Sequence, residues 1–446
     1  MTSYELPSLD LKGSPPAFGH PMLKYFGFDP KYINLNHGSY GSLPTPVSDF
    51  CQKVSRQIES NPDKFVRLDL VHAMRTVRER VASFVGAETD EVVLVPNASH
   101  GVNTVLRNFE WHKHDIIVGA STTYDAIGRV INYLHDIPPH PSVSLFKIAF
   151  PTTRATIIEE FRAHIRLLRA QVDSHQKNIT DGRKLKIVAV IDGLISTPGV
   201  SLPWKEMTQI CREEGVWSVI DAAHAIGQEV DINLASVGPD FWVSNCHKWL
   251  FAKRGCAVLY VPKRNQHIIK STFPTSASYH SQDNSEPSNF VEMFGWNGTV
   301  DHAPYLSINA ALDFRAWLGG EHKINAYCHN LALAGGALLA KSFGTRLLDD
   351  SFTGEMTLNM VNVALPLSPE VPDTPMNRTV LHYKLLVEGK VSAPCFTHNG
   401  RWWARASSQI WNELSDFEHL ARVLKKACHE LEDNYGVNSS SARSKL

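Results

Sequence analysis

The stretch Phe241–Leu250 limits the fold of this chain more than any other segment. It opens with the apolar run Phe241–Val243, directly after a Gly-Pro pair, which predicts a buried strand that starts at a turn. The strand ends in polar residues, of which Lys248 is followed by Trp249 and Leu250. Apolar neighbours remove water from a lysine, which lowers the pKa of its amine and makes the amine a nucleophile. Most lysines simply extend to the surface, so this stretch alone leaves a structural role open.

A second buried strand lies upstream and ends in an acid. Gly215–Asp221 is mostly apolar up to Asp221, and the small-residue run Ala222–Gly227 follows it. Asp221 and Lys248 are 27 residues apart, which leaves room for one crossover between parallel strands, and ligands bind outside the carboxyl ends of such strands. Pyridoxal phosphate (PLP) needs both groups: a lysine for its aldehyde and a carboxylate that keeps its ring nitrogen protonated. The sequence therefore favours a PLP site over the alternative of a structural Asp–Lys ion pair at the sheet edge.

Length and composition argue against several other classes of protein. A chain of 446 residues is too long for one typical core and predicts two domains. It has 20% charged residues, 43% hydrophobic residues and a net charge of −1, so we expect neither a nucleic-acid nor a membrane partner. The seven cysteines lack C-x-x-C spacing and the 21 histidines form no H-E-x-x-H pattern. We therefore expect reduced thiols, without disulfides and without a metal site.

The last three residues match a targeting signal. Ser444-Lys445-Leu446 is the tripeptide that the peroxisomal import receptor reads, and a serine-rich run precedes it. We expect the protein in peroxisomes, or otherwise in the cytoplasm, with a chance match as the alternative.

An anion site is expected after the strand Glu91–Val95. The small-residue turn Pro96–Gly101 follows, and a helix is expected from about residue 102 to 108. The N–H groups and the dipole of a helix N-terminus face such a ligand. No G-x-G-x-x-G or Walker sequence occurs, which argues against nucleotide binding. We place the cofactor phosphate on Ser99 and on the backbone of His100 and Gly101.

Several of these segments resemble one enzyme family. Asp221-Ala-Ala-His-Ala-Ile-Gly227 and Ser244-Asn-Cys-His-Lys-Trp249 resemble the class V branch of fold-type I PLP enzymes. This branch includes cysteine desulfurases, isopenicillin N epimerase-like proteins and fungal C–S lyases. The resemblance is closest to the lyases of ergothioneine biosynthesis, which cleave hercynylcysteine sulfoxide, and to their loline-pathway relatives. It extends from about Asn34 to about Glu432 and includes Asn34–Gly41, Asn103–Asn108, His247–Phe251, Arg264–His267 and Phe273–Ser276.

The resemblance implies an α/β fold, in which helices flank a mostly parallel central sheet and a smaller α+β domain follows. We expect an N-terminal arm over 1–25, a large PLP-binding domain over 26–310, a small C-terminal domain over 311–436 and a flexible tail over 437–446.

Local patterns add expectations about single elements. Hydrophobic spacing predicts helices over 45–59 and 65–85. We expect loops over 34–41 and 171–184. The buried face of the second helix is expected to contain Val71, Met74, Val77, Val81 and Val85.

The resemblance also implies roles at the cofactor. Lys248 would bind its aldehyde and take the α-proton, Asp221 would keep its ring nitrogen protonated, and Tyr124 would stack on its ring and donate a proton to a leaving group. A tyrosine packed on the surface is the alternative for Tyr124. Further contacts would come from His224 and Asp192 near the phenolic oxygen, from Ser99 and His100 at the phosphate, and from Asn245 and His247 beside the lysine.

Other residues would bind the substrate or a second subunit. Arg405 would hold the substrate α-carboxylate, because a planar guanidinium suits a bidentate contact. The alternative is that Arg405 pairs with Asp416 or Glu418. Thr299 would reach the phosphate of a neighbouring subunit, which implies a homodimer with shared active sites. Asn36, His37 and Tyr40 would enter the substrate pocket, unless they only form a turn between the arm and the first helix.

The leading expectation is a PLP-dependent C–S lyase that cleaves a cysteine conjugate or sulfoxide by β-elimination to pyruvate and ammonia. One alternative is an aminotransferase or an amino-acid epimerase of fungal secondary metabolism, because the same bound substrate can be reprotonated elsewhere. The second alternative is a non-catalytic relative that only binds the cofactor, although such a protein would not need Asp221, Lys248 and Arg405 together. The ergothioneine-pathway lyases carry a pocket cysteine after the stacking aromatic residue, whereas this chain has no cysteine between Cys51 and Cys211. We therefore expect a related but not identical substrate.

Overall fold

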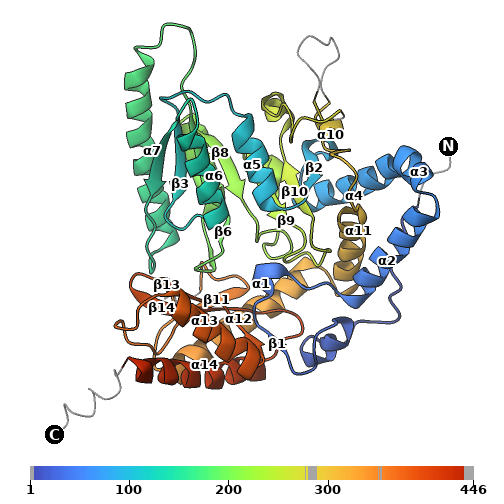
Figure 1. Ribbon diagram of the computed structural model, residues 1–446, viewed down its shortest axis with the longest axis vertical. Coiled ribbons are helices and arrows are strands. Elements are labelled where there is room, and N and C mark those ends of the chain that lie inside the picture. The colour runs from blue at the N-terminus through green and yellow to red at the C-terminus, as the bar shows by residue number, and fades with distance from the viewer. Residues whose placement is uncertain (1–4, 277, 280–288, 350, 352–353, 436–446) are drawn as a thin grey trace.

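A sheet of seven strands forms the centre of the larger part of the molecule (Figure 1). The computed structural model describes residues 5–276, 278–279, 289–349, 351 and 354–435. Strand β10 runs against both of its neighbours, and the other strands are parallel to one another, so that the carboxyl ends of most strands lie at one edge. The order across the sheet is β2 (Val92–Val95), β10 (Ala257–Tyr260), β9 (Phe241–Asn245), β8 (Trp217–Asp221), β5 (Ile187–Asp192), β3 (Ile116–Ala120) and β4 (Ser142–Phe146).

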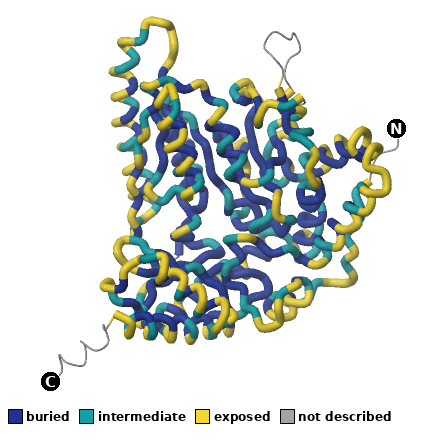
Figure 2. Tube along the Cα trace, in the orientation of Figure 1, coloured by how far each residue is buried: buried dark blue, intermediate teal, exposed yellow. Residues whose placement is uncertain are grey.

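Helices cover both faces of this sheet. Alternate residues of β2 belong to different hydrophobic clusters, with Val92 and Leu94 in one cluster and Val93 and Val95 in the other. In Figure 2 the strands accordingly form a buried layer behind more exposed helices. Continuous apolar strands are expected where both faces of a parallel sheet are covered. The helices α5 (Ala98–Asn108) and α6 (Asp125–Asp136) pack on one face, and α7 (Arg154–Gln176) and α8 (Trp204–Glu213) on the other.

The remaining elements of the larger part are helices and short segments. The helices α2 (Thr45–Ser60) and α4 (Leu70–Val85) both pack on α11 (Ala303–Trp317), and a short helix α3 (Pro62–Lys64) with the π-helical turn Phe65–Asp69 leads into α4. No described helix is long and apolar enough to cross a membrane. Short elements are α1 (His37–Tyr40), β6 (Leu194–Ile195), β7 (Val200–Ser201), α9 (Leu234–Val237), α10 (Phe290–Met293) and the 3-10 segments His20–Tyr25, Thr89–Glu91 and Lys263–Ile268.

The C-terminal part has its own sheet and hydrophobic cluster. Its antiparallel strands lie in the order β11 (Met360–Ala364), β14 (Arg401–Ser407) and β13 (Cys395–His398). Around them lie α12 (Glu321–Phe343), α13 (Pro375–Tyr383), the π-helical turn Lys384–Glu388 and α14 (Leu414–Asn434).

The start of the chain also contacts the C-terminal part. Strand β1 (Ile33–Asn34) pairs in parallel with β12 (Val391–Ser392), and Asn36 forms a β-bridge with Ser407. These contacts bring the residues after β1 to the boundary between the two sheets.

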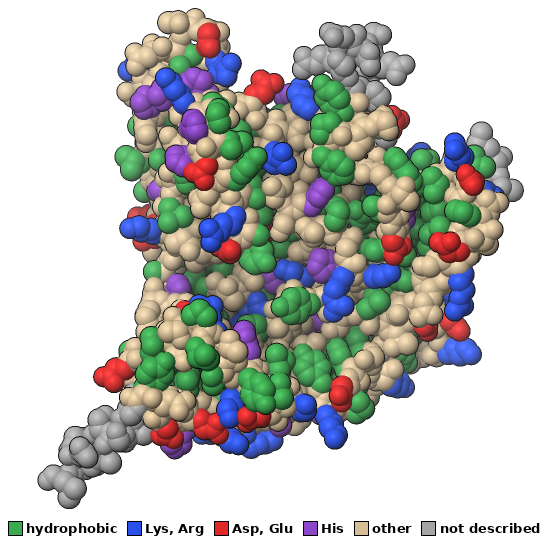
Figure 3. All heavy atoms as spheres, viewed as in Figure 1, with side chains coloured by type: hydrophobic (Ala, Val, Ile, Leu, Met, Phe, Trp, Pro, Cys, Tyr) green, Lys and Arg blue, Asp and Glu red, His purple; other side chains and the backbone are tan. Residues whose placement is uncertain are grey.

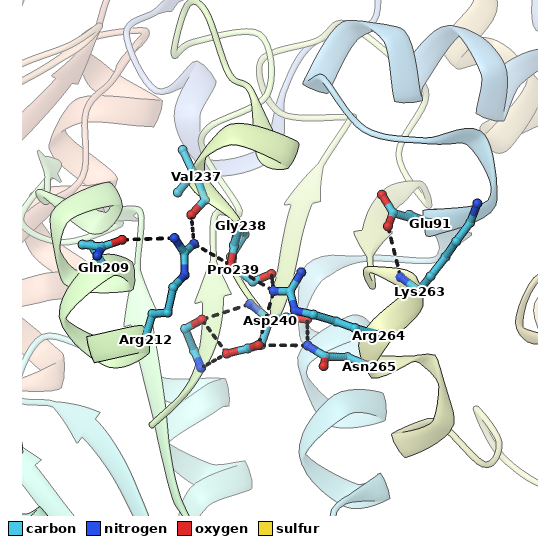
Figure 4. Close-up of polar contacts among 11 residues, drawn as sticks. Glu91, Gln209, Arg212, Val237, Gly238, Pro239, Asp240, Lys263, Arg264 and Asn265 are labelled. Atoms are coloured by element: carbon cyan, nitrogen blue, oxygen red, sulfur yellow. Dashed lines mark hydrogen bonds and ion pairs between the residues drawn. The ribbon is translucent and has the colours of Figure 1, made fainter. Parts of the chain in front are cut away.

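A polar network fixes the starts of β8 and β9 at the amino-terminal edge of the large sheet (Figure 4). The carboxylate of Asp240 accepts hydrogen bonds from the backbone N–H and the hydroxyl of Ser218, at 2.9 and 3.0 Å. It also accepts one from Asn265 at 2.9 Å and faces Arg264 at 3.4 Å. Arg212 caps the preceding turn by donating to the carbonyl groups of Val237 and Gly238. The network therefore sets the register in which the two strands reach the opposite edge.

Several local expectations from the sequence are wrong. Val71 is 72% exposed, because Leu70 takes its place on the buried face of α4, whereas Met74, Val77, Val81 and Val85 are buried as expected. The expected loop over 171–184 begins later, since α7 continues to Gln176.

Other element boundaries also differ. Helix α5 begins at Ala98 instead of about residue 102, and the expected loop over 34–41 contains the short helix α1. The expected domain boundary near residue 311 falls inside α11. The segment 282–288, which we expect to be an exposed loop, and the tail tripeptide lie outside the described residues.

Candidate active site

A cavity of about 220 Å³ lies at the carboxyl ends of β5, β8 and β9. These strands contribute Asp192, Asp221 and Asn245, and the connection after β9 contributes Lys248. Many of the residues that the sequence predicts therefore lie together. The predicted residues in its wall are Tyr40, Ser99, Tyr124, Asp192, Asp221, His224, Asn245, His247 and Lys248, and the wall also contains Ser39, Asn97, Ala98, Leu194, Ser196 and Ala223.

The amine of Lys248 faces the ring of His224. Its Nζ lies 3.0 Å from Nε2 of His224, and the indole N–H of Trp249 donates to Nδ1 of the same ring at 3.3 Å. When Nδ1 accepts a hydrogen bond, the proton of a neutral imidazole lies on Nε2. This N–H then points at the lone pair of an uncharged lysine. Burial lowers the pKa of Lys248 to about 8 and holds the pKa of His224 well below its ordinary value. Near neutral pH, the site therefore keeps a share of Lys248 in the nucleophilic form.

Two buried acids lie side by side at the floor of the cavity. Asp192 and Asp221 are paired in the parallel register of β5 and β8, and each is only 4% exposed. Burial raises the pKa of both carboxyl groups, and the charge of Asp221 raises that of Asp192 further, whereas Lys248 lowers that of Asp221. Two neighbouring carboxylates repel each other, so the pair favours the proton on Asp192 and the negative charge on Asp221, beside Lys248.

The start of α5 supplies a possible anion contact. Asn97 caps the helix by accepting from the N–H of His100 at 2.8 Å, and Asn245 accepts from the N–H of Ala98 at 2.8 Å. The N–H of Gly101 donates to the carbonyl group of Asn97. The backbone groups of His100 and Gly101 that we expected to bind phosphate are thus already used, because the helix begins earlier than expected. Among the described residues, the N–H and hydroxyl of Ser99 have no acceptor and remain available at this helix end.

Arg405 lies beneath the segment that enters the cavity from β1. It donates to Asn36 Oδ1 at 2.9 Å, to the hydroxyl of Ser39 at 2.7 Å and to the carbonyl group of Ser196 at 2.6 Å. Its Nε is buried without a partner among the described residues. Burial lowers the pKa of Arg405 to about 10. The side chain is thus positioned by neutral groups, which leaves its positive charge uncompensated.

The alternative pairing of Arg405 with an acid of α14 is wrong. Asp416 instead accepts from Asn412 at 2.9 Å and faces His20 at 3.0 Å. No ion pair between Arg405 and either Asp416 or Glu418 is present within the described residues.

A close backbone contact joins α1 to the lysine. Gly41, which ends α1, has φ +65°, and a Cβ atom at this position would lie 1.7 Å from the carbonyl oxygen of His247 and 3.1 Å from Cα of Lys248. Only glycine permits both this conformation and this approach. The segment that carries Ser39 and Tyr40 is therefore packed directly on the connection that carries Lys248.

Five predicted residues are absent from the cavity wall within the described part of the chain. Asn36 and Arg405 contact the wall residue Ser39, whereas His37, His100 and Thr299 have other surroundings. His37 is completely buried, and its ring packs edge-on against Trp249, Phe251 and Trp411. Burial lowers the pKa of His37 to about 3, so that it is a neutral core residue behind the site. The side chain of His100 turns away toward Phe273, at 6.4 Å between ring centroids. Thr299 is exposed and lies outside the cavity wall, so its expected role concerns only a second copy of the chain.

Four residues of the site were not singled out from the sequence. Asn97 carries a readable signal, because asparagine directly before a helix is a preferred cap. Trp249 follows the lysine, but nothing in the sequence shows that its N–H fixes the ring of His224. Ser39 and Ser196 position Arg405 from segments far away along the chain, for which a single sequence offers no signal.

Comparisons with known proteins agree with this geometry. The family Aminotransferase class-V matches residues 36–132 and 160–366. The chain is 34% identical to the L-cysteine desulfhydrase-like protein lolT1 of Epichloe uncinata, over 93% of this chain and 96% of the relative. It is 29% identical to the hercynylcysteine sulfoxide lyase of Schizosaccharomyces pombe, over 92% of this chain and 98% of the relative.

A solved structure shows the same fold. It is a C-DES variant with glycine covalently linked to its PLP cofactor, and it superposes with a TM-score of 0.70 at 16% identity, covering 90% of this chain and 98% of that structure. The expected fold-type I architecture, a mostly parallel sheet flanked by helices, is confirmed. The match over most of the sequence and the shared fold lead to one conclusion: the chain belongs to the class-V aminotransferase family.

Proposed function

We propose that the protein is a PLP-dependent C–S lyase, which cleaves a cysteine conjugate or sulfoxide by β-elimination to a sulfur product and aminoacrylate, which water hydrolyses to pyruvate and ammonia. The observation that carries this proposal is the placement of Lys248 and Asp221 in one cavity, at the ends of neighbouring parallel strands. The names of the relatives support the C–S bond as the target, since both the cysteine desulfhydrases and the sulfoxide lyase act on cysteine-derived compounds.

The residues of the cavity fit PLP. Lys248 offers an amine for the aldehyde, and the charged Asp221 suits a protonated ring nitrogen. Asp192 Oδ2 is buried without a partner, which fits a donor to the phenolic oxygen, together with His224. Ser99 at the start of α5 fits the phosphate. Tyr124 lines the cavity as the residue before α6 and is 52% exposed, which leaves its ring available to cover the cofactor.

The side chains divide the work of an elimination. When bound, PLP withdraws electrons from the substrate, so that the α-proton becomes acidic and a β-sulfur can leave. Lys248, with a pKa of about 8, is suited to take the α-proton near neutral pH. Arg405 orients the carboxylate through its uncompensated charge. The hydroxyl of Tyr124 donates a proton to the departing sulfur. Acid and base thus lie on separate groups.

The products test this proposal. The holoenzyme is incubated with cysteine S-conjugates and sulfoxides, and pyruvate, ammonia and the released sulfur species are measured. Formation of pyruvate in step with the sulfur product supports the lyase. Conversion of an added keto acid to its amino acid without pyruvate would identify an aminotransferase, and inversion at the α-carbon alone would identify an epimerase. A protein that binds PLP without any of these reactions is the non-catalytic relative.

We also propose a homodimer. An apolar groove of about 790 Å³ lies beside the 65–74 segment, and it is lined by Val66, Val71, Phe294 and Trp296 among others. Val71 is 72% exposed, which is unusual for a valine and supports cover by a second copy. Thr299 follows Trp296 closely and would reach the neighbouring site. Analytical ultracentrifugation of the wild type and of a Val71→Asp variant tests this proposal. A monomeric wild type would contradict the homodimer.

The location in peroxisomes is likewise our proposal. It rests on the C-terminal Ser444-Lys445-Leu446 and would involve the import receptor that reads this tripeptide. An N-terminally tagged chain should enter peroxisomes, and deletion of the three residues should leave it outside. Equal distribution of both forms would contradict the proposal.

A further inference from the structure

A second cavity adjoins the active site. It has a volume of about 550 Å³, and Ser39 and Tyr40 belong to the walls of both cavities. The rest of its wall comes from the N-terminal segment with Phe28 and Tyr32, from α13 and the turn after it, and from the segment after β12. In Figure 3, hydrophobic side chains lie beside Lys, Arg and His side chains at mid-height of the visible face. Helix α1 lies at this level in Figure 1.

The second cavity reaches close to the reacting lysine. Gly41 lines it, and this residue is in contact with the backbone of His247 and Lys248. Tyr40 is 68% exposed and lines both cavities, and Arg405 donates to the hydroxyl of Ser39, the residue before it. A substrate held by its carboxylate at Arg405 therefore has Tyr40 beside it and the second cavity directly beyond.

The charge of this cavity favours an anion. Arg254 donates from Nε to the carbonyl group of Tyr40 at 3.0 Å and from Nη2 to that of Gly41 at 2.9 Å. Its Nη1 has no partner among the described residues, and the exposed His382 lies in the same wall. No aspartate or glutamate of the described segments lines the cavity. A fixed guanidinium without a neighbouring carboxylate is a suitable partner for an acidic group.

Size separates the roles of the two cavities. The first has about 220 Å³, below the roughly 300–1,000 Å³ that is typical of small-molecule sites. Its wall is occupied by the groups that fit the cofactor and the reacting atoms. A large substituent on the sulfur therefore needs further space. The second cavity supplies this space, with the rings of Phe28, Tyr32 and Tyr40 and the side chains of Leu385 and Leu386 as apolar surface.

We propose that the second cavity binds the leaving group, and that the preferred substrates carry a flat or apolar substituent with an acidic group on the sulfur. The assignment of this cavity to the leaving group rests on the proposed C–S lyase function, whereas the anion site itself rests on Arg254. The acid contacts Arg254, and the body of the substituent packs against the aromatic rings. Substrate choice is then set by residues that take no part in the bond cleavage.

Direct binding tests the site without turnover. We would titrate the holoenzyme with 4-(methylsulfanyl)benzoate and with the corresponding benzamide by calorimetry. The wild type should bind the acid roughly tenfold or more tightly than the amide, as a charge-assisted hydrogen bond implies. Arg254→Met should bring this ratio close to one, while Arg254→Lys should keep part of it. Arg166→Met is the matched control, because Arg166 is an exposed arginine of α7 that pairs with Glu214.

Turnover separates this inference from the proposed function. S-(4-carboxyphenyl)cysteine and its carboxamide are compared by kcat/KM for pyruvate formation. A preference for the acid that Arg254→Met removes supports the inference. Pyruvate from both conjugates at equal kcat/KM, or equal binding of acid and amide by the wild type, overturns the inference and leaves the lyase proposal intact. Absence of pyruvate from both conjugates, with Arg254-dependent binding of the acid, overturns the lyase proposal and leaves the anion site.

Discussion

Carboxylates at opposite edges of the large sheet have very different surroundings. At the amino-terminal edge, Asp240 accepts hydrogen bonds from Ser218 and Asn265 and faces Arg264. At the carboxyl edge, Asp221 accepts one hydrogen bond within the described part of the chain, from the N–H of Ala223, and Asp192 leaves Oδ2 unpaired. A buried polar group without a partner costs free energy unless a ligand supplies one. The difference shows that one edge of the sheet serves structure and the other is prepared for a ligand.

Removal of the lysine should have the largest effect at the carboxyl edge. We expect Lys248→Ala to abolish turnover, because no other amine lines the cavity within the described residues. The near-visible absorbance of the holoenzyme, and its loss on borohydride treatment, should also disappear. The measurement is a spectrum of the purified variant beside a pyruvate assay. Retention of both properties would remove Lys248 from the reaction.

Loss of Asp221, the charged acid at the same edge, should have the next largest effect on activity. Asp221→Ala should slow exchange of the substrate α-proton with solvent by roughly 100-fold or more, because an electrophile loses its charge partner. Some cofactor should remain bound through the other contacts. NMR detection of α-proton exchange in deuterated water measures this, with Asp221→Glu as the variant that retains the charge. An unchanged exchange rate would show that Asp221 is structural, like Asp240.

A substitution at the opposite, amino-terminal edge should lower the stability of the fold and not the activity. Asp240→Ala removes the carboxylate that accepts from the buried Ser218 and leaves Asn265 only the backbone carbonyl group of residue 240, and it should lower the free energy of unfolding by about 2–4 kcal/mol. The kcat per folded molecule should stay within about twofold of wild type, since the network lies at the far end of the strands. Urea unfolding measures the loss. Glu79→Ala, which removes an exposed ion pair on α4, should leave the free energy of unfolding almost unchanged. A large loss of kcat at full folding would contradict the contrast between the edges.

The smallest effect is expected from a change of Asp192, and this effect on the free energy of unfolding depends on pH. The pKa of Asp192 is raised above its ordinary 3.8 by burial first and then by Asp221, so the folded chain holds this proton more tightly than the unfolded chain. The folded state therefore loses stability as pH rises from about 4 through the folded pKa. Asp192→Asn removes this loss. At pH 7 the free energy of unfolding of the variant should therefore exceed that of the wild type by about 1–2 kcal/mol, and near pH 4 the two values should be similar. Urea unfolding of the apoprotein across this range measures it, and a pH-independent difference speaks against a raised pKa.

The sequence predicts the large sheet better than it predicts the contacts between distant segments. The apolar runs that end in Asp192, Asp221 and Asn245 indicated buried strands, because continuous burial leaves few alternatives. Lys248 was found for the same reason, as a polar residue at the end of such a run. The fold-type I architecture and the family were correct.

Contacts that depend on tertiary packing were not predictable. Ser196 is 209 residues from Arg405, and no local pattern connects them. Val71 was placed on the wrong face, because its valine side chain suits a core equally well and only the angle of α4 against its neighbours decides. His37 was placed in the pocket, although the short helix α1 turns its ring into the aromatic core. A single sequence does not contain these orientations.

The pairing of the first strand with the last part of the chain has a consequence for the newly made protein. Asn36 and Arg405 are 369 residues apart, yet both are needed where the substrate carboxylate would bind. At about 5–20 residues per second, a ribosome needs roughly 20–75 s to make the intervening segment. All seven strands of the large sheet are made well before Arg405, whereas the surface that would receive β1 is made only near the end of this time. A chain interrupted before Arg405 can therefore present its lysine and acids at the strand ends but has no guanidinium to select an amino acid.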